Sequence, residues 1–269
     1  MDQIEVSKNE ISVPEVPSAI AKAPSTRASA NAGVALWRTR YGILKANQAT
    51  DLVARSLTRY GEWIEQELDT IGTLLDEGHV AVQYGAEYGA HALYLSDLVA
   101  ETGEVHVVEP RRLEHIGLCT AVALNDLHNV YPHHAALGER AERIELKPVG
   151  ELPAERVHCM PLDAMELTAL NLLKINPPGA LMSVLAGASE TLRKHKPAIY
   201  FRLSTMEQAV TEVAALKTHG YRCWSHHPYL YNPSNLLGNK LNIFPGWAYQ
   251  NVIAIHRDAP AEFEYLLEI

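Results

Sequence analysis

The segment from His79 to Pro110 constrains the fold more than any other part of the chain. An apolar run leads into a turn with two glycines, Gly85 and Gly89, and a helical pattern follows at 90–99. A second apolar run then ends at Glu109. A strand, a turn without bulky side chains and a helix N-terminus together leave backbone N–H groups open to a ligand. The segment therefore predicts a site for a cofactor that contains a nucleoside; the alternative is plain packing of a helix on a sheet.

The remaining pattern alternates strand and helix, which favours a mostly parallel sheet with helices on both faces. Pro132 interrupts the third predicted strand and cannot donate a ladder hydrogen bond, so that strand is expected at an edge of the sheet. The segments 144–147 and 156–159 are expected to form a small hairpin or extension. The predicted strands are 79–83, 105–109, 130–135, 172–176, 198–203, 221–225 and 252–256, and the predicted helices are 57–75, 90–99, 113–124, 164–170, 180–192 and 206–219.

Four regions are expected along the chain. Residues 1–32 are rich in proline and serine and have no sustained period, which is typical of a flexible leader or docking arm. Residues 33–78 form a predicted helical cover, residues 79–258 the α/β domain, and residues 259–269 a C-terminal tail. The chain shows no internal repeat.

Composition excludes several classes of protein. The chain has 269 residues and a net charge of −9, which disfavours a non-specific grip on nucleic acid. Three widely spaced cysteines (Cys119, Cys159 and Cys223) are typical of reduced, mostly buried thiols. No apolar run is long enough to span a membrane, and the pairs His133/His134 and His226/His227 do not have the spacing of a metal site. We expect a cytoplasmic protein without metal, membrane or nucleic-acid partners.

From Tyr41 to about Arg257 the sequence resembles the FkbM-type S-adenosylmethionine-dependent methyltransferases. The resemblance is collinear and rests on YGILKANQ, RYGEW, VQYGAEYGAHALYL, VVEPRR, LNDLHNVYPHHAALG, LDAM, LLKINPPGA, HKPAIYFRL and HHPYLYNPSN. It implies a class I (Rossmann-like) methyltransferase fold, in which a mostly parallel seven-stranded sheet carries helices on both faces and ends in an antiparallel hairpin. It also implies S-adenosyl-L-methionine as the cofactor.

The chain departs from the family at two places that bear on chemistry. Family members typically read D-V-G-A at the first loop, where this chain has Gln83-Tyr84-Gly85-Ala86. They typically read I-D-V-E-G after the fourth strand, where this chain has Ile175-Asn176-Pro177-Pro178-Gly179. Three carboxylates expected around the cofactor and its substrate are therefore absent.

The resemblance implies a set of cofactor-binding residues, of which Glu109 is the most informative. Glu109 would accept the ribose hydroxyls, or else cap the following helix through the N–H of Arg111 or Leu113. Asp163 would accept the adenine amino group, cap the predicted helix 164–170, or do both. Glu87 would replace the missing loop aspartate or stand as a solvated carboxylate. The full predicted cofactor set is Gln83, Gly85, Ala86, Gly89, Glu109, Pro110 and Asp163.

The predicted acceptor side begins at Asn176-Pro177, which is similar to the [DN]-P-P motif of nucleobase amino-methyltransferases but lacks the aromatic that follows it. Catalytic candidates are Asn176, Pro177 and Glu67, and the alternative for the diproline loop is drift after loss of catalysis. Since neither Asn176 nor Pro178 can accept a proton, His91, His226 and His227 are candidate bases. The predicted substrate residues are Trp63, Tyr231, Asn232 and Asn235, with Trp247 beside them at the mouth.

Three functions fit this pattern. The first is O-methylation of a small-molecule or sugar hydroxyl by an S-adenosylmethionine-dependent methyltransferase. The second is a catalytically degenerate methyltransferase fold kept as a binding or scaffold module, and the third is an N-methyltransferase that uses Asn176-Pro177-Pro178. The acceptor would be a small molecule or a glycan. A protein partner bound through the leader and a homo-oligomer are both left open.

Overall fold

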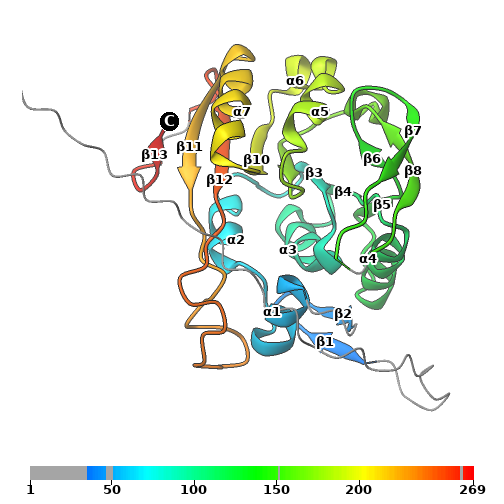
Figure 1. Cartoon of the computed structure of the whole chain (residues 1–269), viewed down its shortest axis with the longest axis vertical. Helices are drawn as coiled ribbons and strands as arrows, with labels where there is room; N and C mark the ends of the chain where they lie inside the picture. The colour runs from blue at the N-terminus through cyan, green and yellow to red at the C-terminus, as the bar shows by residue number, and fades with distance from the viewer. Residues whose placement is uncertain (1–34, 47–50, 151, 261–262) are drawn as a thin grey trace, which may run out of the picture. The chain divides into compact units, whose positions relative to one another are not determined.

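The computed structural model describes residues 35–46, 51–150, 152–260 and 263–269 (Figure 1). The predicted leader, residues 1–32, lies outside the described residues. The described part is built around one large sheet with helices packed on it, together with two smaller sheets. This is the α/β organisation expected from the alternation of strands and helices.

The large sheet has eight strands in the order β13-β11-β12-β10-β9-β3-β4-β5. The pairs β3–β4, β3–β9, β4–β5 and β9–β10 are parallel, whereas β12 runs antiparallel to both β10 and β11. This is the strand order of class I methyltransferases, with the antiparallel hairpin at one side, and it confirms the predicted fold. The strands are β3 (Val80–Tyr84), β4 (Glu104–Val108), β5 (Val130–His133), β9 (Leu172–Ile175), β10 (Ala198–Arg202), β11 (Tyr221–His226), β12 (Asn251–His256) and β13 (Leu267–Glu268).

Two expectations about the edges of this sheet have different outcomes. The proline-containing strand β5 is indeed an edge strand, where Pro132 lies opposite Val107. The expected number of seven strands was wrong by one, because Leu267 and Glu268 of the predicted tail pair with β11. The tail therefore extends the sheet by a short strand.

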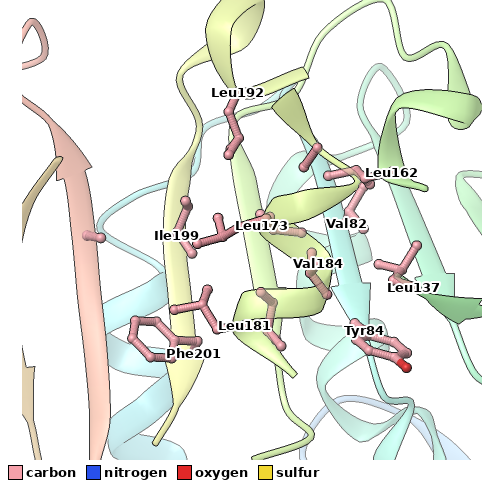
Figure 2. Packing of buried hydrophobic residues seen from close by; sticks show 14 of the residues in the cluster. Val82, Tyr84, Leu137, Leu162, Leu173, Leu181, Val184, Leu192, Ile199 and Phe201 are labelled. Atoms are coloured by element: carbon pink, nitrogen blue, oxygen red, sulfur yellow. The ribbon is translucent and has the colours of Figure 1, made fainter. Parts of the chain in front are cut away.

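The core lies on both faces of the sheet because successive residues of a strand point to opposite sides. Val82, Leu173 and Ile199 face one cluster (Figure 2), while their neighbours Ala81 and Leu172 face the other. The first cluster is covered by α5 (Leu181–Ala186), α6 (Ser189–His195) and α7 (Met206–Thr218), and the second by α2 (Glu65–Ile71), α3 (Ala90–Val99) and α4 (Arg112–Leu124).

The predicted helix 57–75 was wrong: the structure has two shorter helices, α1 (Leu52–Tyr60) and α2. Gly61 ends α1 in the left-handed conformation with φ of 70°, which glycine adopts without steric cost. Ile64, with φ of 47°, starts α2 after a turn of the chain. This break directs Trp63 and Glu67 into the interior, where both are fully buried.

Other predicted elements also changed. The helix expected at 180–192 is divided into α5 and α6 at Gly187, and the helix expected at 164–170 is absent. In its place a single 3-10 turn, η2 (Leu162–Met165), ends at Glu166 with φ of 49°. The cover is not purely helical, since β1 (Leu36–Arg38) and β2 (Ile43–Lys45) form a hairpin. The small hairpin expected at 144–159 is confirmed as part of a three-stranded sheet of β6 (Ala136–Leu137), β7 (Glu142–Leu146) and β8 (Glu155–Met160).

Candidate functional site

The carboxyl ends of β3, β4, β9 and β10 meet at one edge of the sheet (Figure 1). Gly85, Glu109, Asn176 and Arg202 follow or end these four strands in turn. In open α/β sheets this edge is where ligands bind, because side chains and loop backbones from several strands converge there. The structure thus brings together the predicted glycine loop, the predicted ribose acceptor and the predicted acceptor-side asparagine.

The glycine loop is held in an uncommon backbone conformation. Gly85 and Gly89 have φ of 88° and 93°, which suits glycine, but Glu87 and Tyr88 between them also have positive φ, at 45° and 63°. A Cβ on Gly85 would lie 3.2 Å from the Pro177 ring, and one on Gly89 would lie 3.3 Å from Ala121 Cβ. Glycine is therefore needed at both positions for packing within the chain. This agrees with the alternative that the two glycines serve the packing of a helix on the sheet.

Glu109 directly follows β4 and bridges two segments of backbone. Its Oε2 accepts the N–H of Ala86 at 2.8 Å, and its Oε1 accepts the N–H of Arg111, also at 2.8 Å. The contact with Arg111 is the one expected in the capping alternative, and the ribose role stays a prediction. Burial, reinforced by the nearby Glu114 carboxylate, raises the pKa of Glu109 to about 8. When it is ionised, this carboxylate has two of its four lone-pair sites left for further donors; when it is protonated, it forms a hydrogen bond with the Glu114 side chain.

The two departures from the family motif meet at one atom. The side-chain amides of Gln83 and Asn176 both donate to the carbonyl oxygen of Gly85, each at 2.8 Å. A carboxylate at either position would bring a second acceptor to that oxygen instead of a donor. The two substitutions therefore act as a matched pair that secures the glycine loop.

Lys174 is the third residue of β9 and is fully buried. Its Nζ lies 2.7 Å from Glu67 Oε1 and also donates to Asn176 Oδ1. Both ends of the Asn176 amide are thus engaged within the chain, one by Lys174 and the other by Gly85. A buried ammonium needs such partners because its desolvation is otherwise costly.

Glu67 reaches this site from α2 and lies among cationic and amide groups. Asn251 Nδ2 donates to its Oε2 at 2.9 Å, and Arg202 Nη2 lies 3.8 Å from the same oxygen. Burial alone would raise the pKa of Glu67, but the neighbouring charges, with Lys174 the strongest, lower it to about 2. Glu67 is therefore ionised at neutral pH and sealed from solvent.

Glu87 and Arg202 form a second ion pair beside the first. Arg202 Nη1 lies 2.9 Å from Glu87 Oε1, and Trp63 Nε1 donates to Glu87 Oε2 at 3.0 Å. The Tyr249 ring stacks on the guanidinium, with 3.8 Å from Cζ to the ring centroid. The sequence analysis did not identify Arg202, Lys174 or Tyr249. Lys174 and Arg202 could have been found because each is a cation within an apolar run predicted to be a central strand.

Asp163 does not cap the expected helix, because that helix is absent. Its two carboxylate oxygens instead accept the N–H groups of Glu190 and Thr191, at 3.1 and 2.8 Å, and so cap the start of α6. Whether Asp163 also accepts an adenine amino group stays a prediction.

The predicted substrate residues of the long loop lie around Glu62. Asn232 Nδ2 donates to Glu62 Oε1 at 2.8 Å, Asn235 bonds within the loop, and Tyr231 packs on Tyr60 with ring centroids 5.3 Å apart. These contacts hold the loop against α1. From the same loop, Tyr249 is the residue that reaches Arg202.

The candidate bases lie in different surroundings. His226 is buried and bonded to Tyr200 and Thr70, and it borders a cavity of about 670 Å³ between α2, the end of β11 and the C-terminal segment. His227 lines the same cavity and is exposed. His91 is fully buried beside Glu67, and burial, followed by Lys174, lowers its pKa, so its ring is neutral at pH 7.

The described residues contain neither a metal-binding cluster nor a membrane-spanning helix. No group of three or more His, Cys, Asp or Glu side chains in that part of the chain is arranged to hold a metal ion. In the same part, no helix combines the length and apolar character needed to cross a bilayer.

Comparison with known proteins finds similar folds. No protein-family model and no curated protein matches the sequence. An FkbM methyltransferase structure from Methylobacillus flagellatus KT is 14% identical over 76% of this chain and 55% of its own, with a TM-score of 0.49. A precorrin-6y C5,15-methyltransferase from Geobacter metallireducens GS-15 is 15% identical over 71% of this chain and 87% of its own, with a TM-score of 0.48. An S-adenosylmethionine-dependent O-methyltransferase from Thermotoga maritima is 12% identical over 85% of this chain and 87% of its own, also with a TM-score of 0.48. The chain spans about half the length of the first of these proteins. At these values the fold assignment rests on the strand order of the sheet, and the activities of these proteins are not carried over to this chain.

Proposed function

We propose that the protein is an S-adenosylmethionine-dependent methyltransferase that acts on a hydroxyl group of a small molecule or sugar. The observation that carries this proposal is the placement of Glu109 beside the glycine loop, at the adjoining carboxyl ends of β4 and β3. In this fold that crevice is the place for a nucleoside, and the pairing of a strand-terminal acid with a glycine loop suits its ribose.

The residues present fit the cofactor. Glu109 keeps lone pairs for the ribose hydroxyls after accepting from Ala86 and Arg111. The loop from Gly85 to Gly89 leads into the N-terminus of α3, whose dipole favours an electron-rich group nearby, although the N–H groups of Gly85, Ala86 and Gly89 are bonded within the chain. When bound, the cofactor supplies an electrophilic methyl group; the chain supplies its orientation and the exclusion of water.

The acceptor would bind on the β10 side of the loop. Arg202 Nε and Nη2 are buried and have no hydrogen-bond partner among the described residues, so they are donors for an acceptor oxygen. Glu87 is the more exposed of the two carboxylates here and would accept a hydrogen bond from the hydroxyl; burial would raise its pKa, but Arg202 and Lys174 outweigh burial and lower it, so Glu87 stays ionised. The half-buried Tyr249 adds aromatic surface, which suits a carbohydrate or another hydroxylated ring, and the fully buried Trp63 supports it from behind, with ring centroids 6.0 Å apart.

In the N-methyltransferase alternative, the Asn176 side-chain oxygen and the Pro177 carbonyl oxygen accept hydrogen bonds from the amino group of the substrate. Lys174 donates to that oxygen, and Ala180 N–H donates to that carbonyl at 3.2 Å. Because both acceptors are already engaged, the geometry favours a hydroxyl acceptor over an amine.

Isothermal titration with S-adenosylhomocysteine tests the proposal. At pH 9, where Glu109 is ionised, the parent chain should bind, and Glu109→Ala should bind at least about thirtyfold more weakly, since a charged acceptor is worth about 2–3 kcal/mol. The matched control is Glu104→Ala, at the opposite end of the same strand, which should bind like the parent. Melting curves check that both variants fold, because Glu109 also bonds to the loop backbone.

A methyl-transfer assay with labelled S-adenosylmethionine and a panel of hydroxyl and amine acceptors then separates the chemistries. Turnover with hydroxyl acceptors supports the proposal. Turnover with amines alone would replace it with the N-methyl alternative, and absence of ligand binding by the parent would leave the scaffold role.

A further inference from the structure

A closed ring of polar side chains begins and ends on the glycine loop. At one end of the loop, the carbonyl of Gly85 accepts from Asn176, and the Asn176 oxygen accepts from Lys174. The Lys174 ammonium then pairs with Glu67 at 2.7 Å. These contacts link the start of the loop to α2, which lies outside the parallel part of the fold.

From Glu67 the ring returns to the loop. Arg202 Nη2 lies 3.8 Å from Glu67 Oε2, and Arg202 Nη1 lies 2.9 Å from Glu87 Oε1. Glu87 is only two residues beyond Gly85. The two fixed points of the ring therefore lie on either side of Ala86, the residue whose N–H bonds to Glu109.

The ring balances its own charge. It contains two carboxylates, Glu67 and Glu87, and two cations, Lys174 and Arg202, and all four side chains are buried or nearly so. A balanced buried set avoids the large penalty of a lone buried charge but adds little net stability over an apolar core. Its main physical effect is then to fix geometry.

The loop needs such a constraint. Glu87 and Tyr88 both have positive φ, a strained conformation for non-glycine residues that persists only where the surroundings impose it. The ring holds Glu87 by its carboxylate, so the strained turn cannot relax without breaking the pair with Arg202.

We propose that Glu67 and Lys174 are positioning residues for the glycine loop: they touch neither cofactor nor acceptor but hold the loop in the shape that binds the nucleoside. The part of this inference that concerns the ligand rests on the proposed function. The part that concerns the loop does not.

The test is the double variant Glu67→Gln/Lys174→Met, which opens the ring while conserving net charge and leaving no buried charge unpaired. Hydrogen exchange is measured without ligand on the peptide that covers 85–90, whose amides bond to Val108 O, Glu109 Oε2 and Ala86 O. We expect exchange there to rise at least about tenfold above that of the parent, with the unfolding midpoint changed little. Affinity for S-adenosylhomocysteine should fall about tenfold.

The matched control is Lys196→Met/Asp258→Asn, which removes a lysine–carboxylate ion pair from the surface. It should leave both loop exchange and affinity unchanged. Arg202→Lys opens the ring at its other side and gives the same two readouts if the double variant does not fold.

Loop exchange equal to that of the parent in the ring variants would overturn the ring as a constraint. Faster loop exchange with unchanged affinity would overturn its role in positioning the ligand site. If the parent itself does not bind S-adenosylhomocysteine, the proposed function fails, while the exchange measurement still decides whether the ring holds the loop.

Discussion

The two halves of the carboxyl edge are held together in different ways. On the nucleoside side, around β3 and β4, side chains bond to backbone groups that are close in the fold, as Glu109 does with Ala86 and Arg111. On the acceptor side, around β9 and β10, side chains bond mainly to one another, as in the pairs Lys174–Glu67 and Arg202–Glu87. The first arrangement depends on local chain geometry, whereas the second depends on charges that must all be present together.

This difference predicts where single substitutions are most damaging. Lys174→Met leaves Glu67 buried without its nearest cation and should destabilise the fold by about 3–5 kcal/mol. Urea denaturation measures the change. Lys196→Met, which removes the cation of an exposed pair, should cost about 0–1 kcal/mol. Equal effects of the two variants would show that the buried side is not under special constraint.

The amides at the boundary between the two halves come next. Asn176→Asp and Gln83→Asp each replace a donor to Gly85 O by an acceptor and should each destabilise the fold by about 1–3 kcal/mol. Introducing either aspartate of the FkbM-type motif singly should therefore destabilise this chain.

The control for the amides is Asn171→Asp. Asn171 uses its side-chain oxygen to accept the N–H of Val80 at 2.9 Å, and an aspartate keeps that acceptor. The unfolding free energy of Asn171→Asp should therefore change by less than that of Asn176→Asp or Gln83→Asp. A stabilised Gln83→Asp would contradict the assignment of the shared carbonyl, since no cation contacts that side chain among the described residues.

On the nucleoside side, the raised pKa of Glu109 predicts pH-dependent binding. The carboxylate is the better acceptor of ribose hydroxyls, so affinity should rise with pH from 6.5 to 9, through the pKa of about 8. Methylthioadenosine is a suitable probe because it lacks the titrating amino-acid group. In Glu109→Gln the affinity should be lower and independent of pH over this range; a pH dependence retained there would assign it to another group.

The smallest expected effect is on the acceptor side. Tyr249→Leu removes the ring over the Arg202 guanidinium, a contact worth about 0.5–1 kcal/mol, and should raise KM for the acceptor about two- to fivefold. Affinity for S-adenosylhomocysteine should stay as in the parent. Trp247→Leu, on the exposed part of the same loop, should change neither KM nor affinity. An effect of this variant would indicate that the acceptor binds near Trp247, as the sequence predicted.

The sequence predicted which residues meet around β3 and β4 better than which residues meet around β9 and β10, for a physical reason. Gly85, Gly89 and Glu109 belong to one strand–turn–helix–strand unit, so their spacing along the chain indicates their spacing in the fold. The acceptor side joins Glu67, Lys174 and Arg202, which are far apart in sequence and come from a helix and two strands. No periodic pattern encodes such a junction.

The mispredicted helices have local causes. The pattern at 57–75 has helical spacing throughout, and Gly61 and Ile64 break it by taking left-handed conformations. Asp163 resembled an N-cap for residues that follow it, but it caps α6, which begins more than twenty residues later. Backbone conformation decided the first case and a tertiary contact the second, and local propensity had left both open.

The central claim is that a nucleoside binds where the glycine loop meets Glu109. The most direct measurement is a crystal structure of the full chain with S-adenosylhomocysteine. We expect both ribose hydroxyl oxygens within about 2.5–3.0 Å of the Glu109 carboxylate, the distance range of such hydrogen bonds, with the Ala86 contact kept. Ligand found instead in the cavity beside His226, or no ligand at saturating concentration, would contradict the claim.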